Sequence, residues 1–418
     1  MTDPRLPIRL RSRSRLLTAL IVAVALVGQP AAVLGDHGGR DIGSLLRCDR
    51  PVNPPRCTSV GDNLRHVVVF DATLTDGLAD ALRDTLAEDY GPTKLTTVVD
   101  ETVTDRTDVV AYSEDYGDNG AAGWVYCPAD APQGVNARGD RWCREQQLHF
   151  NLNPRYAIFF ADEASRDHVA CHEIGHTVGL LHWGNPPESA EPTAATCMNS
   201  NTPNGPTGLH EIDRDHINAY AYSLPRRPHP WIRFIAEGPA IRATASAWST
   251  ASVDALEVEH FATPDELVAA ADAVVRGRIV SVGPGRTFGG ATGVPFRYAA
   301  ATVVVDELLA GSLPGGHRST LTLEIPLYGG DATLARLQQL EALDSVFLLR
   351  NKGESARAAG MAAGDVARDA DYYRLVTQDA VIEERGGRAT LPAGGDGALE
   401  VFEGLRFDLV VSRLRAAD

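Results

Sequence analysis

The stretch ACHEIGHTVGLLHW, residues 170–183, places three histidines and one glutamate within eleven positions of the chain. On an α-helix, residues four apart lie about 40° apart around the axis and about 6 Å apart along it. His172 and His176 can therefore reach one ion from the same helix face, and Glu173 can touch a water on that ion. This HExxH spacing predicts a zinc site in which Glu173 is the general base.

His182 can join this site only if the helix ends before it. A straight helix would place His182 about 9 Å further along the axis than His176 and about 240° around it. Gly179 stands between them, and glycine readily takes the left-handed conformation that ends a helix and turns the chain back. We therefore predict a hinge at Gly179 and His182 as the third ligand. His168 stands about 12 Å from His176 along the axis, so we interpret it as a partly exposed residue at the helix start.

The pattern His172-Glu173-x-x-His176-x-x-Gly179-x-x-His182 resembles the signature of the metzincin zinc metalloproteases at every fixed position. The resemblance covers roughly residues 65–224 and is nearest to matrixin-like bacterial secreted metalloproteases. It implies a Met-turn, a methionine loop beneath the metal, and Met198 stands where that loop is expected. It also implies that substrate lies along the edge strand of the sheet, which we predict to be Gly123, Trp124, Val125 and Tyr126.

These features predict a zinc endopeptidase that acts on protein or peptide substrates. Three neutral imidazoles leave one zinc position for water, whose pKa the metal lowers to around 7. Glu173 would take the proton of the attacking water and pass it to the leaving amine. The alternative is a secreted binding protein with a structural zinc site, in which a C-terminal β domain carries the function.

All six cysteines fall between residues 48 and 197. An even number of cysteines in an exported chain suggests disulfides. We expect neighbours to pair, as Cys48–Cys57, Cys127–Cys143 and Cys171–Cys197, and the last bond would tie the active-site helix to the Met-turn. The segment around Cys57 is similar to the matrixin segment whose cysteine blocks the zinc, so a free Cys57 is the alternative to its disulfide.

The loop at 113–123 contains three carboxylates, Glu114, Asp115 and Asp118. Since loops in matrixins bind calcium, the resemblance makes these residues candidate Ca²⁺ ligands. Ordinary solvated carboxylates are the alternative. Zn²⁺ is thus the expected cofactor, and Ca²⁺ is a second candidate.

The first 35 residues have the order of a secretory signal peptide, with five arginines, an apolar run at 16–27 and then small residues. The apolar run is too short to favour a spanning helix, which needs about 20 residues; an uncleaved anchor is the alternative. Removal of residues 1–35 changes the net charge from −16 to about −20, which disfavours nucleic-acid binding. We expect a secreted, monomeric protein without stable membrane insertion.

The remaining chain predicts an α+β metzincin-like domain, with a twisted mixed sheet, an active-site helix and a C-terminal helix, followed by a mostly β domain. The expected divisions are an N-terminal extension at 36–64, the catalytic domain at 65–224, a linker at 225–255 and an accessory domain at 256–418. Catalytic-domain strands are expected at 66–72, 95–99, 108–112, 123–127 and 147–153. Helices are expected at 75–89, from Ser165 or Asp167 onward, and at 209–224. The C-terminal strands, at 273–283, 298–311, 320–327, 345–350 and 372–384, suggest a small barrel or sandwich, with a weak resemblance to OB-like modules.

Overall fold

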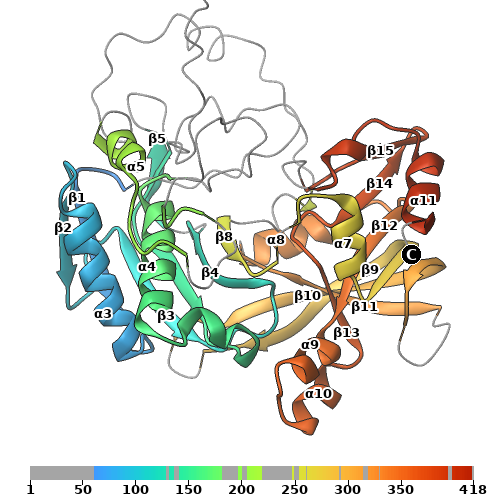
Figure 1. The fold of residues 1–418 in the computed structure, drawn as a ribbon, viewed down its shortest axis with the longest axis horizontal. Coiled ribbons are helices and arrows are strands. Elements are labelled where there is room, and N and C mark those ends of the chain that lie inside the picture. The colour runs from blue at the N-terminus through green and yellow to red at the C-terminus, as the bar shows by residue number, and fades with distance from the viewer. Residues whose placement is uncertain are drawn as a thin grey trace, which may run out of the picture.

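The structure is a computed structural model that describes residues 61–128, 131–135, 141–180, 196–199, 205–218, 247–248, 254–259, 261–290, 293–313, 319–328, 330–393 and 398–416. The predicted signal peptide, the Cys48–Cys57 pair, His182 and most of the predicted linker lie outside these residues. The described residues form a mixed α+β structure with two large sheets, which lie side by side in Figure 1. Within the described ranges, no helix combines the length and the apolar composition that crossing a membrane requires.

The first sheet has six strands in the order β2-β1-β3-β7-β4-β8. They are β1 (Arg65–Phe70), β2 (Thr96–Asp100), β3 (Val109–Glu114), β4 (Ala121–Tyr126), β7 (Gln146–Asn151) and β8 (Asp254–Glu257). Strands β2, β1, β3 and β7 are parallel, whereas β4 is antiparallel to β7 and β8 is antiparallel to β4. A hairpin of β5 (Gln133–Val135) and β6 (Arg141–Cys143) follows β4. The continuous burial of Val67, Val68 and Val69 in β1 is typical of a parallel strand with both faces covered.

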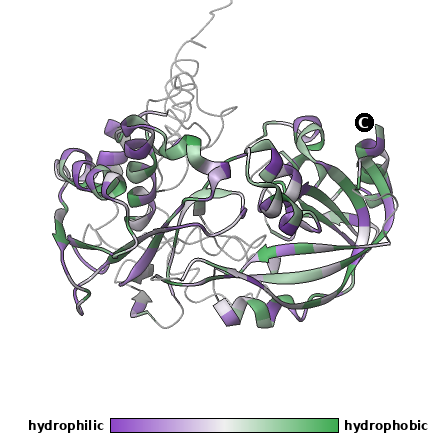
Figure 2. Cartoon of the chain, turned by 90° about the horizontal axis from the view of Figure 1, so that it is seen from below, coloured by the Kyte–Doolittle hydropathy of each residue, from purple (hydrophilic) through white to green (hydrophobic). Residues whose placement is uncertain are grey.

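Helices α3 (Asp76–Thr85) and α4 (Glu163–Thr177) pack against each other beside this sheet, and α4 also contacts β4, β7 and β8. Leu78, Ala81 and Leu82 of α3 are buried, and Figure 2 shows the helices of this part with a hydrophilic and a hydrophobic side. The helix predicted at 75–89 is interrupted, because its last turn is a π-turn, η1 (Leu86–Tyr90). A 3-10 helix, η2 (Pro154–Phe160), precedes α4, and α5 (Glu211–His216) follows the Met-turn segment.

The start of α4 differs from the prediction. Neither Ser165 nor Asp167 caps the helix, because Asp162 is the N-cap and its carboxylate accepts a hydrogen bond from the Ser165 amide at 2.8 Å. The helix therefore begins at Glu163, and Ser165 is buried within its first turn.

The second sheet has seven strands in the order β13-β11-β10-β9-β12-β14-β15, and a further pairing joins β13 to β12. The segment expected at 372–384 is two strands, because the chain turns between them, where the Ala380 amide donates to the Thr377 carbonyl at 3.1 Å. The strands are β9 (Ala273–Phe288), β10 (Phe296–Gly311), β11 (Thr320–Pro326), β12 (Ser345–Asn351), β13 (Tyr372–Leu375), β14 (Val381–Arg385) and β15 (Arg388–Thr390). The accompanying helices are α7 (Pro264–Ala270), α8 (Gly330–Leu337), α9 (Lys352–Ala358), α10 (Ala363–Asp369), η5 (Glu400–Phe402) and α11 (Phe407–Ala416).

Strand β8 corrects the prediction that β4 is the edge of the first sheet. β4 lies between β7 and β8, so β8 takes the edge. Neighbouring side chains of a strand point to opposite faces, and both faces of β8 are buried. Leu256 lies in the core around α4, and Ala255 lies in an apolar cluster shared by the two sheets, with Tyr116, Ala121, Trp124, Phe296, Tyr298 and Tyr328. The predicted boundary between linker and accessory domain, at 255/256, thus falls inside a strand of the first sheet.

Candidate metal centre

Helix α4 ends where the spacing of the histidines predicts. Gly179 has a φ of 91°, which is the left-handed conformation. Its amide donates to the His176 carbonyl at 3.1 Å, and the Leu180 amide donates to the Gly175 carbonyl at 2.8 Å. These are the two hydrogen bonds of a Schellman motif, which satisfies the last carbonyls of a helix and turns the chain away. His182, two residues after Leu180, lies outside the described residues.

His172 and His176 point their Nε2 atoms toward each other, at a distance of 3.0 Å. Each Nδ1 lies near a backbone carbonyl oxygen, that of Cys197 at 2.8 Å and that of Leu180 at 2.9 Å. Because a carbonyl only accepts, each Nδ1 carries the proton and each Nε2 carries a lone pair. Two lone pairs this close repel each other unless a cation lies between them. Two nitrogens bound to one tetrahedral zinc at 2.0–2.1 Å would be about 3.3 Å apart, so the pair fits this ion.

Both histidines of the pair are fully buried. Burial lowers the pKa of His176 to about 4, although its contact with the Leu180 carbonyl acts in the opposite direction. His176 is therefore neutral at neutral pH, which is the form that binds metal ions.

His168 is buried as well, so the prediction of a partly exposed residue is wrong. Its Nδ1 lies 2.7 Å from the Pro206 carbonyl oxygen, because the segment after the Met-turn covers the first turns of α4. Burial lowers the pKa of His168. Its ring centroid is 6.2 Å from that of His172.

Glu173 lies where β4 and β8 pair. The carboxylate is fully buried, and a Cβ atom on Gly123 would stand 2.5 Å from Glu173 Oε1. Only a glycine allows the carboxylate so close to the backbone of β4. The same oxygen accepts a hydrogen bond from the Leu256 amide at 3.3 Å, and Leu256 is the partner of Gly123 in the β4–β8 ladder.

Met198 packs directly on α4 between the two histidines. A Cβ atom on Gly175 would lie 2.2 Å from Met198 Sδ, and Met198 is fully buried. The preceding residue is disulfide-bonded as predicted, in the pair Cys171–Cys197. The predicted bond Cys127–Cys143 is also present and joins the end of β4 to β6.

The three carboxylates of the acidic loop do not form a calcium site. Glu114 accepts a hydrogen bond from the Gly290 amide at 2.6 Å. Asp115 accepts from the Gly117 amide and from Asn153. Asp118 is paired with an arginine, which occupies the place a cation would take. In the described part of the chain, no three His, Cys, Asp or Glu side chains are grouped as metal ligands.

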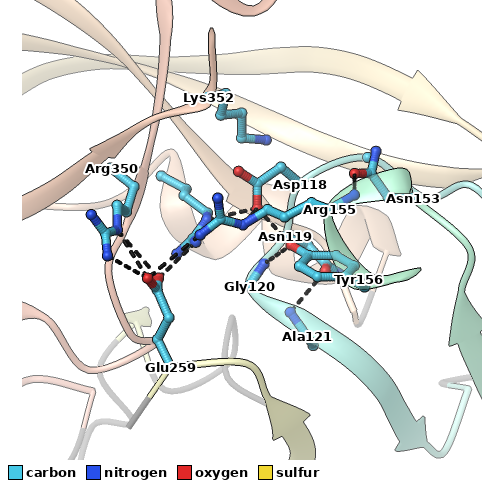
Figure 3. A network of polar contacts seen from close by, with 12 residues as sticks. Asp118, Asn119, Gly120, Ala121, Asn153, Arg155, Tyr156, Glu259, Arg350 and Lys352 are labelled. Atoms are coloured by element: carbon cyan, nitrogen blue, oxygen red, sulfur yellow. Dashed lines mark hydrogen bonds and ion pairs between the residues drawn. The ribbon is translucent and has the colours of Figure 1, made fainter. Parts of the chain in front are cut away.

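A second polar network, which the sequence analysis missed, joins the two sheets (Figure 3). Arg374 donates from Nε to Asp118 at 2.8 Å and from Nη2 to Glu259 at 2.8 Å. Burial alone would raise the pKa of both carboxyls, but the surrounding cations together outweigh burial, and both pKa values lie below their usual range. These cations are Arg374 and Arg155 at both carboxyls, with Lys352 at Asp118 and Arg350 at Glu259. No local pattern predicts this network, since its residues lie far apart in the sequence.

No protein-family model matches the chain, and no curated protein matches it. Among solved structures, the chain is similar to the crystal structure of myroilysin, with 12% sequence identity and a TM-score of 0.26. The match covers 40% of this chain and 86% of that chain.

Proposed function

We propose that the chain is a secreted zinc endopeptidase of the metzincin type. In this proposal His172, His176 and His182 hold the zinc, and Glu173 is the general base. The observation that carries it is the 3.0 Å approach of two imidazole Nε2 atoms beside a buried carboxylate. When bound, zinc supplies a polarised scissile carbonyl and a water whose pKa is near 7.

The residues around the ligands have distinct roles in this proposal. The carbonyls of Cys197 and Leu180 keep the protons of His172 and His176 on Nδ1, so that both Nε2 atoms face the metal. The Glu173 carboxylate takes a proton from the attacking water and gives it to the nitrogen of the leaving amine. Gly123, Trp124, Val125 and Tyr126 of β4 bind the main chain of an extended substrate by strand addition, which requires that β8 leave this side of β4.

Export and the accessory domain belong to the same proposal. Two disulfides are typical of proteins from oxidising compartments, which supports secretion after removal of residues 1–35. The second sheet would be an OB-like barrel that carries no catalytic group.

The test is Glu173→Gln in the zinc-loaded chain, assayed on denatured protein and on a peptide library. We expect the variant to keep its zinc, because Glu173 is no ligand, and to lose hydrolysis by about 100-fold or more. Glu163→Gln is the matched control, an exposed residue on the same helix, and should leave both quantities unchanged. Equal hydrolysis in the Glu173 and Glu163 variants would contradict the proposal. Bound zinc without hydrolysis, in every form of the chain, would support the secreted binding protein.

A further inference from the structure

We infer that β8 occupies the place of the substrate strand, so that the chain's own segment 254–257 competes with substrate and slows hydrolysis by the intact chain. The inference rests on the proposed function, because it names the occupant of the site at which a substrate would bind. It follows from three features of the structure: the β4–β8 ladder, the contact with Glu173, and the anchoring of the chain after β8.

The ladder uses the backbone groups of β4 that a peptide would need. On one side β4 pairs with β7, and on the other Val125, Trp124 and Gly123 pair with Asp254, Ala255 and Leu256. The Val258 amide extends the contact by donating to the Gly120 carbonyl at 2.9 Å. An extended peptide that binds by strand addition requires a free strand edge. With β8 in place, β4 has no free edge.

The contact with Glu173 places the backbone of β8 at the position that the scissile amide of a substrate would take. Glu173 Oε1 accepts a hydrogen bond from the Leu256 amide nitrogen at 3.3 Å. In the proposed reaction this carboxylate delivers a proton to the nitrogen of the scissile amide. The Leu256 nitrogen therefore stands where that nitrogen would stand.

The apolar surroundings hold β8 firmly in this position. The Leu256 side chain is fully buried in the core that contains Ile174 and Val178 of the active-site segment. His172, Glu173 and His176 are themselves 0% exposed, so a peptide reaches them only after a rearrangement.

An ion-pair network anchors the chain immediately after β8 (Figure 3). Arg350 and Arg374 of the second sheet both bind Glu259. Arg374 also binds Asp118, in the loop that leads into β4. The Arg374 guanidinium thus joins the loop before β4 to the segment directly after β8.

The inference is tested with Leu256→Asp, which puts a carboxylate into an apolar core and favours release of β8. Leu409→Asp is the matched control, because it makes the same change on α11 at a side chain that is 46% exposed. Val258→Pro is a second, milder variant, since it removes the donor to the Gly120 carbonyl without placing a charge in the core. Circular dichroism and thermal unfolding establish that each variant is folded.

Two measurements are made on the full chain. With zinc, Leu256→Asp should hydrolyse a peptide library about tenfold or more faster than wild type, in proportion to the fraction with β8 released. Leu409→Asp should match wild type, and Val258→Pro should lie between. Without zinc, a labelled peptide with the sequence of residues 251–259 should bind Leu256→Asp about tenfold or more tightly than wild type, measured by fluorescence anisotropy.

The outcomes separate the inference from the proposed function. Equal hydrolysis and equal peptide binding in wild type and Leu256→Asp would overturn the inference and leave the peptidase intact. Tighter peptide binding without hydrolysis in any zinc-loaded form would refute the peptidase but keep β8 as the occupant of the β4 edge. Cleavage of the Ala255–Leu256 bond in zinc-loaded wild type, detected by mass spectrometry, would overturn the inhibition, since β8 would then be a substrate.

Discussion

At the scale of single residues, two glycines make the proposed site compact. Gly123 allows the Glu173 carboxylate to approach the backbone of β4, and Gly175 allows Met198 to lie against α4. Neither position needs glycine for its backbone conformation, because neither residue has a φ in the left-handed region. Both positions need glycine because a Cβ atom would not fit, and this crowding is visible only once α4, β4 and the segment of Met198 are brought together.

Gly175→Ala should therefore destabilise the protein. The added methyl group would stand 2.2 Å from Met198 Sδ and 3.1 Å from the Tyr90 hydroxyl, and overpacking of a core costs about 1–3 kcal/mol. The free energy of unfolding, measured in urea, is the quantity to compare.

Gly364→Ala is the control for this substitution. Gly364 lies in α10 with no atom within 4 Å of its added methyl group, so alanine should be neutral or stabilise by about 0.5–1 kcal/mol. Equal stability of the two alanine variants would show that Met198 moves aside without cost.

At the scale of elements, the site depends on how α4 is tied to the Met-turn. The Cys171–Cys197 bond links the two elements, and the Cys197 carbonyl orients the His172 ring. The Tyr90 hydroxyl adds a hydrogen bond from η1 to the Cys171 carbonyl at 2.9 Å. Helix α4, which carries His172 and His176, is thus held at Cys171 by both the disulfide and the Tyr90 hydroxyl.

Replacing Cys171 and Cys197 by serine should weaken zinc binding as well as stability. In the chain-entropy model, loss of a bond that closes this loop lowers the free energy of unfolding by about 3 kcal/mol. Because the Cys197 carbonyl orients a ligand, zinc affinity should also fall by about tenfold or more. Competition with a chelator measures this affinity.

The matched control is the double replacement of Cys127 and Cys143 by serine. It should cost a similar amount of stability, since the two loops span 16 and 26 residues, but should leave zinc affinity unchanged. A similar loss of zinc affinity in both variants would show that the 171–197 bond has no specific role at the site.

At the scale of the whole molecule, buried polar groups lie where the two sheets meet. His149 of β7 stacks on Trp124 and Tyr112, with ring centroids 5.0 and 5.1 Å apart. Trp124 in turn packs on Phe296 of the second sheet. Burial lowers the pKa of His149 to about 3, so this ring stays neutral in the folded protein. Protonation of the ring would put a charge into this apolar stack.

Stability should therefore fall as the pH drops below about 6.5. The unfolded chain binds a proton at His149 with a pKa near 6.5, whereas the folded chain does so only near 3, so acid favours unfolding. Through His149 alone, each pH unit in this window costs about 1.4 kcal/mol, or about 2–3 kcal/mol between pH 6.5 and 4.5. Burial also lowers the pKa of His66, His168 and His176, which adds to the loss, whereas it raises the pKa of Asp108 to about 7, which opposes it. Urea unfolding across this range measures the slope.

His149→Phe should flatten this slope, because the variant has no proton to bind there. The carboxyls of Asp118 and Glu259 act in a separate window. Their pKa values are lowered in the folded state, so their contribution is present above their unfolded pKa, near 4, and lost only as the pH falls further. An unchanged slope in His149→Phe would assign the acid sensitivity to other groups.

Features that depend on local spacing follow from the order of residues alone. The helical repeat places His172 and His176 on one face, and the turn after them needs a left-handed residue, which Gly179 supplies. The apolar runs of β1 and β3 likewise predict strands, whereas their parallel pairing is known only from the structure. The start of α4 was missed by a few residues, because any of several polar side chains could cap it and Asp162 does.

The segment that covers the proposed site is known only from the folded chain. A strand edge accepts any segment that offers backbone donors and acceptors, so the spacing of residues does not reveal that 254–257 pairs with β4. The same holds for Arg374 of the second sheet, whose partners Asp118 and Glu259 lie before β4 and after β8 of the first sheet. Ligand geometry is thus a local property of this chain, whereas access to Glu173 depends on contacts between distant segments.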